Sequence, residues 1–104
     1  MYYISIMRER PALIWDEWNK KHIRKHKITE EEVEDAFANE FGRNDSYYYR
    51  FAVYGKTKKG RLVTIIISFK TKTKFYVVTA RDMSRKERRK YYDKIISSQT
   101  DTSI

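Results

Sequence analysis

Cysteine is absent from this chain of 104 residues, which excludes a disulfide framework, a thiolate zinc site and a cysteine nucleophile. The sequence also lacks the glycine-rich loops that bind nucleotide phosphates and the Gly-x-Ser-x-Gly turn of serine hydrolases. No apolar run approaches the ~20 residues of a membrane-spanning helix. The N-terminus has neither the basic start nor the cleavage site of a signal peptide. We therefore expect a cytoplasmic protein that needs no metal and no other cofactor.

Glycine and proline are scarce, at three residues and one residue, which predicts short loops between regular elements. A chain of this length supports one modest hydrophobic core. We expect a single domain over residues 1–104. Within it, residues 1–10 are expected to form an extra N-terminal arm or edge strand, and residues 97–104 a loose tail.

Positive charge dominates the chain, with a formal net charge of +9. It is unevenly placed, because residues 29–45 contain seven acidic side chains and a single arginine. The basic remainder should attract polyanions and speed their encounter. Nucleic acid is the commonest partner of a small basic protein, and an acidic protein is the second possibility.

The first part of the chain predicts a short strand at residues 12–15 and a helix from the N-cap Asp16 to about His26. Trp15, Trp18, His22 and His26 recur at helical spacing. We therefore expect this side of the helix to be semi-apolar, with Trp18 buried.

A capping box, Thr29-x-x-Glu32, opens a second helix. This helix is expected to stop near residues 41–42, where Gly42 can supply a left-handed C-terminal cap.

Three segments with β pattern follow, at residues 47–54, 62–69 and 74–80, and the second is the most apolar and should be the central strand. Their connectors are short enough for hairpins. A further capping box, formed by Ser84 and Glu87, opens a last helix. Together these elements predict an α+β fold with a mainly antiparallel sheet of about four strands, two N-terminal helices and one C-terminal helix. The expected order is β-α-α-β-β-β-α, with the helices on one face of the sheet.

Residues 85–90 are basic at five of six positions, beginning with Arg85. Clustered cations beside tyrosines suit phosphate binding, while a solvated helix face is the alternative interpretation. Tyr48, Arg50 and Tyr54 share strand parity and are expected to face outward. There an arginine could hold a phosphate and a tyrosine could stack on a base, unless these side chains merely fill a solvent-facing strand.

His22 and His26 lie one helical turn apart. A metal site is a weak interpretation of this pair, since structural zinc usually needs four protein ligands and no third histidine exists. Packing beside tryptophan is a second interpretation. General acid–base chemistry is a third, because histidine titrates near neutral pH.

The order of several motifs resembles that of BrnT-type toxins over residues 13–92. The motifs are Trp15-Asp16, Asn19, Lys25-His26, Ile28-Thr29-x-Glu31-Glu32-Val33, Ala36-Phe37, Tyr49-Arg50, Tyr54-Gly55, Gly60-Arg61 and Ala80-Arg81-x-Met83-Ser84-x-x-Glu87-Arg88-x-x-Tyr91. Two departures stand out, namely Lys27 where relatives commonly have glycine, and the extension at residues 1–10.

The resemblance implies a RelE/ParE-like fold and the toxin of a type II toxin–antitoxin pair, which cleaves RNA without a metal. It also implies a ribbon-helix-helix antitoxin that neutralises the toxin, with the complex alone binding operator DNA. Carried over by motif position, the residues of interest are Lys25, His26, Arg50, Arg61 and Arg81.

Metal-free RNA cleavage needs a base, an acid and cations that stabilise the phosphorane. We assign His26 as the base or acid, and Arg50, Arg61 and Arg81 as contacts to the transition state. The expected RNA or phosphate contacts are Lys25, Tyr48, Tyr54 and Arg85. Two other functions stay open: a ParE-like toxin that inhibits a protein such as gyrase, and a nucleic-acid-binding module without catalysis.

Overall fold

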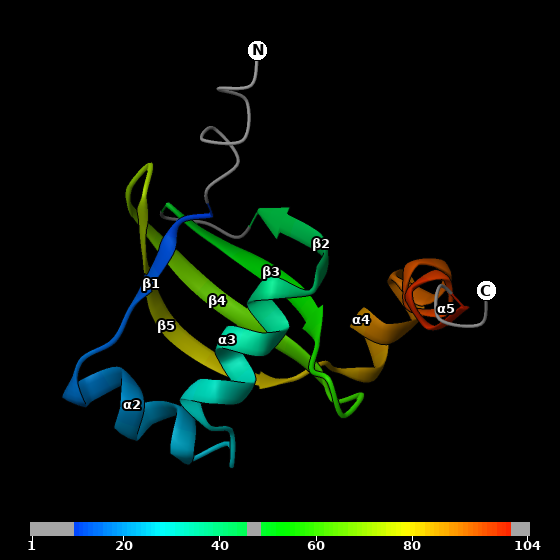
Figure 1. Ribbon diagram of the computed structural model, residues 1–104, viewed down its shortest axis with the longest axis horizontal. Coiled ribbons are helices and arrows are strands. Elements are labelled where there is room, and N and C mark those ends of the chain that lie inside the picture. The colour runs from blue at the N-terminus through cyan, green and yellow to red at the C-terminus, as the bar shows by residue number, and fades with distance from the viewer. Residues whose placement is uncertain (1–9, 46–48, 101–104) are drawn as a thin grey trace.

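The computed structural model of the protein describes residues 10–45 and 49–100. Over these residues the chain forms a five-stranded sheet and four helices. In chain order they are β1 (Ala12–Ile14), α2 (Glu17–Arg24), α3 (Glu30–Ala38), β2 (Glu40–Asp45), β3 (Arg50–Lys56), β4 (Leu62–Thr71), β5 (Lys74–Asp82), α4 (Arg85–Lys90) and α5 (Tyr92–Thr100) (Figure 1).

The strands lie in the order β1-β5-β4-β3-β2, with β1 parallel to β5 and every other neighbouring pair antiparallel. At the centre, Ile65 of β4 is in register with Val53 of β3 and Ala80 of β5. The α+β class, the mainly antiparallel sheet and the central position of the most apolar strand are confirmed. Strand β4 lies at the centre of the sheet, where both of its faces are covered. This favours a run of Ile and Val in its sequence.

Helices α2, α3 and α4 each begin at a capping box. The sequence predicts the boxes of α3 and α4, and for α2 it predicts the N-cap residue Asp16. The N-cap and N3 pairs are Asp16–Asn19, Thr29–Glu32 and Ser84–Glu87. In each pair the N-cap side chain accepts a hydrogen bond from the N3 backbone amide, and the N3 side chain accepts one in return. None of the described helices is both long and apolar enough to cross a membrane.

Strand β2 is the fifth strand, which the sequence analysis missed, and the helical cap predicted at Gly42 is wrong. Helix α3 ends earlier, at Ala38, and is capped by Asn39, whose side-chain amide donates to the Asp35 carbonyl at 3.0 Å. Gly42 lies in β2 without a positive φ. A Cβ at this position would come within 2.8 Å of the Tyr91 ring, so the missing side chain makes room for an aromatic residue far along the sequence.

The C-terminal segment also differs from the single predicted helix. It forms α4 and α5, which meet at Tyr91. Residues 97–100, predicted as part of a loose tail, belong to α5. The expected arm at residues 1–9 and the last part of the tail, residues 101–104, lie outside the described residues.

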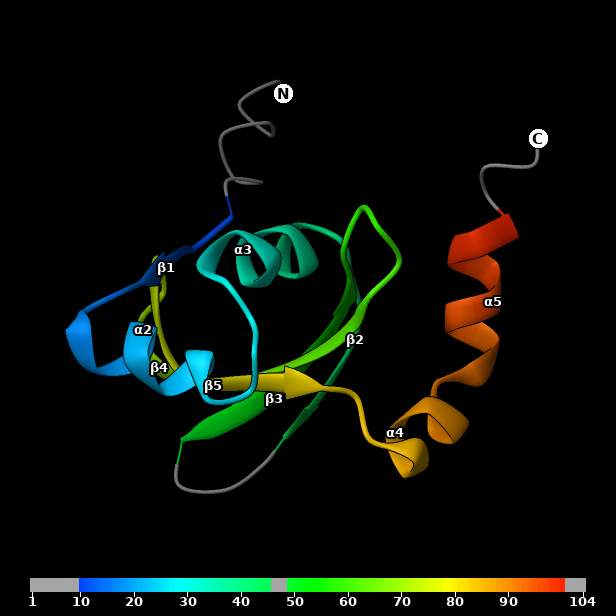
Figure 2. The same ribbon diagram turned by 90° about the horizontal axis from the view of Figure 1, so that it is seen from below.

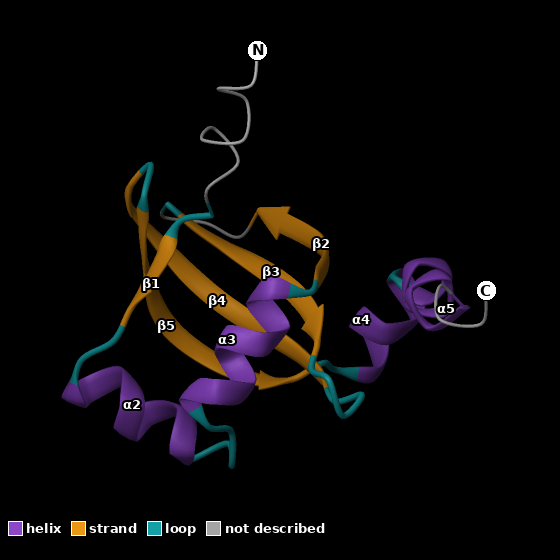
Figure 3. Cartoon of the chain, viewed as in Figure 1, coloured by secondary structure: helices purple, strands orange, loops and turns teal. Residues whose placement is uncertain are grey.

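Two hydrophobic clusters lie on opposite faces of the sheet. Helices α2 and α3 cover one face, where Ile23, Phe37 and Ile65 belong to the larger cluster (Figures 2 and 3). On the other face, Ile95 of α5 packs with Ala52, since successive residues of a strand alternate between faces. The prediction of helices on one face therefore holds for α2 and α3 and is wrong for α5.

Candidate nucleic-acid interface

Three chain segments meet at one end of the sheet, and we call them together the basic edge. They are the turn after α2 (residues 25–27), the loop of the β3–β4 hairpin (residues 57–61) and the segment from the end of β5 into α4 (residues 82–88). Arg61 joins all three, because its Nη1 donates to the Lys27 carbonyl at 2.9 Å and its Nε donates to Asp82 Oδ1 at 2.7 Å. In both Figure 1 and Figure 2 the turn after α2 passes beside the end of β5.

Arg61 is neutralised by two carboxylates. Besides Asp82, its Nη1 contacts Glu32 Oε1 of α3 at 3.1 Å. The hydrogen bond to Asp82 contributes most to raising the pKa of Arg61, and the contact with Glu32 adds to it. The guanidinium therefore holds the three segments in place, and most of its donors are used within the protein.

His26 lies exposed in the turn after α2, where its backbone amide donates to the Ile23 carbonyl at 2.9 Å. The next residue, Lys27, has a φ of 59°, in the left-handed region that glycine adopts most readily. The turn thus keeps the conformation for which glycine is suited, although the side chain here is lysine. The Lys27 carbonyl then points to Arg61.

The Asp82 carboxylate interacts with several cations of the basic edge. The hydrogen bond from Arg61 lowers the pKa of Asp82 below its ordinary value, and the charges of Arg88 and His26 lower it further. His26 and Arg88 therefore lie within electrostatic range of the same carboxylate, although they come from segments far apart in the sequence.

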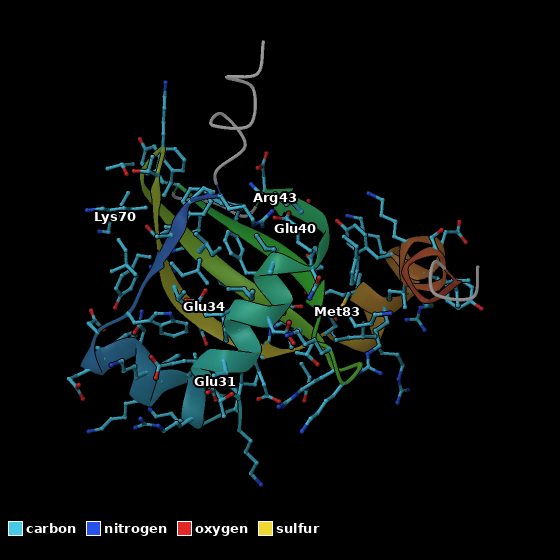
Figure 4. All side chains as sticks on the ribbon, viewed as in Figure 1. Glu31, Glu34, Glu40, Arg43, Lys70 and Met83 are labelled. Carbon is cyan, nitrogen blue, oxygen red and sulfur yellow. The ribbon has the colours of Figure 1, made fainter. Side chains whose placement is uncertain are left out.

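Helix α4 presents exposed cations beside this carboxylate. Arg85 and Arg88 are exposed, and in the described part of the chain neither forms a salt bridge. Together with Met83 they line a surface hollow of about 320 Å³; Figure 4 labels Met83 where the chain leaves β5. Because they are exposed and have no ion-pair partner among the described residues, these guanidinium groups are available to an external phosphate.

Arg81 lies near the same end of the sheet but on the opposite face from Asp82, since the two residues are adjacent in β5. Its Nη1 and Nη2 donate to Glu87 at 2.9 and 2.8 Å. Glu87 also accepts from the Ser84 amide and the Thr64 hydroxyl, each at 2.9 Å. Burial disfavours the charged carboxylate, but these hydrogen bonds outweigh it and lower the pKa of Glu87 to about 2.

Arg50 is separated from the basic edge. It is the first residue of β3, in register with Ser68, whereas Lys56 at the other end of β3 is in register with Leu62. The six steps between Arg50 and Lys56 correspond to about 20 Å along the strand. Arg50 is exposed, but it does not converge with His26 and Arg61.

Tyr54 shares a strand parity with Arg50 and lies on the face opposite Val53, as expected. The expectation that it faces solvent is wrong: it is 3% exposed, and its ring lies 4.6 Å from that of Tyr91. Burial, followed by the negative charge of Glu87, raises the pKa of Tyr54. The segment from α4 to α5 therefore covers the position at which Tyr54 was expected to stack on a base.

Of the remaining predicted residues, Tyr48 lies outside the described residues. Lys25 is exposed at the C-cap of α2, next to His26. The structure thus brings Lys25, His26, Arg61 and Arg85 to the basic edge.

Sequence reasoning missed both carboxylates that hold arginines at this end of the sheet. Asp82 and Glu87 are the two acidic residues between positions 74 and 90. Each binds an arginine: Asp82 binds Arg61, and Glu87 binds Arg81. An isolated acid in a strongly basic segment is the signal that could have identified them.

No group of three or more potential metal ligands is found among the residues described by the structure. Comparison of the sequence with models of protein families and with curated proteins finds no match.

Proposed function

We propose that this chain is a metal-independent ribonuclease toxin of a type II toxin–antitoxin pair, with a RelE-like fold and with the basic edge as its active surface. One observation carries the proposal: His26 is exposed within electrostatic range of Asp82, and on the same edge lie the exposed guanidinium groups of Arg85 and Arg88, which form no salt bridge in the part of the chain that the structure describes. A titratable imidazole beside free cations suits transfer of a phosphodiester. The resemblance in motif order to BrnT-type toxins supports the same function.

In the proposed reaction, His26 accepts the proton of a ribose 2′-hydroxyl while the 2′ oxygen attacks the adjacent phosphorus. The bond from phosphorus to the 5′ oxygen breaks, which leaves a 2′,3′-cyclic phosphate, and a proton from water completes the released 5′-hydroxyl. Arg85 and Arg88 are the free cations for the charge that develops on the phosphoryl oxygens. Arg61 acts as a positioning residue, because it holds the turn that carries His26.

The proposed partner is an acidic ribbon-helix-helix antitoxin that covers the basic edge, and operator DNA is bound only by the complex. Long-range attraction would guide such a partner to the cations. The exposed acids of α3, such as Glu31 and Glu34 in Figure 4, should lie outside the contact, because like charges repel.

Expression of the chain alone in bacteria tests the proposal. We expect growth arrest with degraded RNA, and cleavage by the purified protein that persists in EDTA. Arrest with intact RNA and inhibited gyrase would instead favour a ParE-like toxin, and loss of cleavage that returns with a divalent ion would contradict the metal-free mechanism.

Three variants locate the active surface. His26→Gln should abolish cleavage, and Arg88→Ala should reduce it by about tenfold or more, since one charge-assisted contact is worth about 1.5–3 kcal/mol. Arg50→Ala is the matched control, because Arg50 is also an exposed arginine but lies at the other end of β3. Equal loss in Arg50→Ala and Arg88→Ala would exclude the basic edge as the specific site.

A nucleic-acid-binding module without catalysis is the second candidate. It is favoured by the ion pairs of Arg61 and Arg81, since two of the three arginines assigned to the transition state are already neutralised within the protein. RNA binding by the wild-type protein without any cleavage would select this function.

A further inference from the structure

Three aromatic rings form a row along the outer side of α2 and the turn that follows it. The rings of Trp18 and His22 are stacked, with centroids 4.8 Å apart and an interplanar angle of 10°. The His26 ring continues the row, with its centroid 6.1 Å from that of His22. We call these side chains the aromatic row.

The aromatic row faces solvent, contrary to the expectation that Trp18 is buried. Trp18 is 58% exposed, whereas the buried residues of α2 are Asn19 and Ile23. The Asn19 side-chain amide donates to the carbonyls of Ile14 and Val77 at 2.9 and 3.0 Å. Because these bonds anchor α2 to β5, the opposite side of the helix, with the row, is held outward on a rigid element.

Unpaired cations flank the aromatic row. Lys21 and Lys25 line a small surface hollow of about 190 Å³ together with Trp18 and His22. Both lysines are exposed, and within the described ranges neither forms a salt bridge. Between positions 17 and 27 there are five lysines and arginines and one acid, Glu17.

An exposed aromatic surface with adjacent cations matches what single-stranded nucleic acid offers. Its bases have free faces that stack on aromatic side chains, and its phosphates bind cations. A duplex hides the faces of its bases within its own stack. The row runs from Trp18 through His22 to His26, which lies on the basic edge.

We propose that Trp18 and His22 form a base-stacking platform for single-stranded RNA, with Lys21 and Lys25 binding the phosphates of the same segment. The strand then runs along α2 toward His26, so that the platform selects which nucleotides reach the basic edge. This inference rests on the proposed function and adds to it the class of RNA and the path of the bound strand along α2.

Tryptophan fluorescence tests the platform directly, because the chain has only two tryptophans. In a Trp15→Phe variant, Trp18 is the only reporter. We expect a short single-stranded 2′-O-methyl RNA, which cannot be cleaved through its 2′ oxygen, to quench this fluorescence with saturation. A duplex of the same sequence should quench it far less.

Affinity variants give an independent readout, measured by the anisotropy of a labelled 2′-O-methyl RNA in the otherwise wild-type chain. Trp18→Ala should weaken binding by about 5- to 140-fold, as expected for one lost base-stacking contact. Phe69→Ala is the matched control, since Phe69 is a similarly exposed aromatic side chain (49%) and lies in β4 rather than on α2. Equal affinities of Trp18→Ala and the wild type would overturn the platform.

Cleavage of unmodified RNA separates this inference from the proposed function. Quenching and binding without cleavage would support the platform and contradict the ribonuclease. Cleavage by a protein whose Trp18 fluorescence does not respond to RNA would support the ribonuclease and overturn the platform.

Discussion

Four arginines at the same end of the sheet differ in what their guanidinium groups already bind. Arg61 and Arg81 are each neutralised by carboxylates, whereas Arg85 and Arg88 are exposed. A guanidinium has five donors, and those used within the protein are not free for phosphate. The free arginines are therefore the better candidates for RNA contacts, and the paired ones maintain the shape of the site.

Glu87 should make the stability of the protein depend on acid. Its pKa is lowered to about 2 from an ordinary 4.5, so its contribution is fully present above about pH 4.5 and is lost as the pH falls toward 2. The shift corresponds to about 3 kcal/mol in the free energy of unfolding. Glu87→Gln should remove this part of the acid dependence, as measured by urea unfolding between pH 2 and pH 6.

Glu31→Gln is the control for Glu87→Gln, because Glu31 is exposed on α3. It should leave the acid dependence nearly unchanged. If the two variants lost the same amount, the bonds from Arg81, Ser84 and Thr64 would not be the source of the effect.

Lys27 should tolerate glycine, because its φ of 59° lies in the left-handed region. This conformation costs a residue with a side chain about 1–2 kcal/mol, and glycine avoids that cost while losing more chain entropy. We expect Lys27→Gly to match or exceed the wild-type stability by up to about 1 kcal/mol. Lys25→Gly, at a right-handed φ of −62°, should instead lose stability in the same thermal melts, and a loss of equal size in both would contradict the argument.

At the scale of elements, α3 and β3 approach each other closely at Gly55. A Cβ on Gly55 would lie 1.9 Å from the Ala36 carbonyl oxygen, which is backbone and cannot rotate away. At Gly42 the nearest atoms belong to the ring of Tyr91, at 2.8 Å. The first contact fixes how deeply α3 sits on the sheet, and the second fixes where the segment from α4 to α5 meets β2.

Gly55→Ala should therefore destabilise the protein strongly, by about 3 kcal/mol or more, since overpacking against backbone forces α3 away from the sheet. Gly42→Ala should cost less, because the Tyr91 side chain can shift. The free energies of unfolding in urea test this order, and a smaller loss for Gly55→Ala than for Gly42→Ala would contradict it.

At the scale of the whole molecule, charge is divided between surfaces. The exposed acids of α3 lie on the helix that packs over the sheet, and the free arginines lie on α4 at the basic edge. Binding of a polyanion should therefore be oriented by the field of the protein as well as by contacts.

Affinity for RNA should fall steeply with salt, because each neutralised phosphate releases counterions. For single strands the slope of log K against log salt is about −0.7 for each phosphate contact. Arg88→Ala should make the slope shallower by about that amount, while Arg50→Ala should leave it unchanged. Anisotropy titrations of 2′-O-methyl RNA over a series of salt concentrations measure both slopes, and identical slopes for Arg88→Ala and the wild type would remove Arg88 from the interface.

Much of the local structure followed from the sequence by itself. The N-caps at Thr29 and Ser84, the central strand and the antiparallel hairpins were all predicted, because each depends on residues within a few positions of one another. The short strand β2 was missed, since its six residues include Gly42 and several polar side chains and carry little β pattern.

The composition of the candidate site was decided only by the tertiary structure. Arg61 meets Asp82 over 21 positions and the Lys27 carbonyl over 34, so no local pattern reveals that its donors are used. Tyr54 has the parity of an exposed residue, yet it is buried, because Tyr91 from a distant segment covers it. Helical periodicity alone could not tell which side of α2 faces the sheet, and the bonds of Asn19 to β1 and β5 turn Trp18 toward solvent. Spacing therefore placed residues on elements, while packing between distant segments determined which of them are free to meet a ligand.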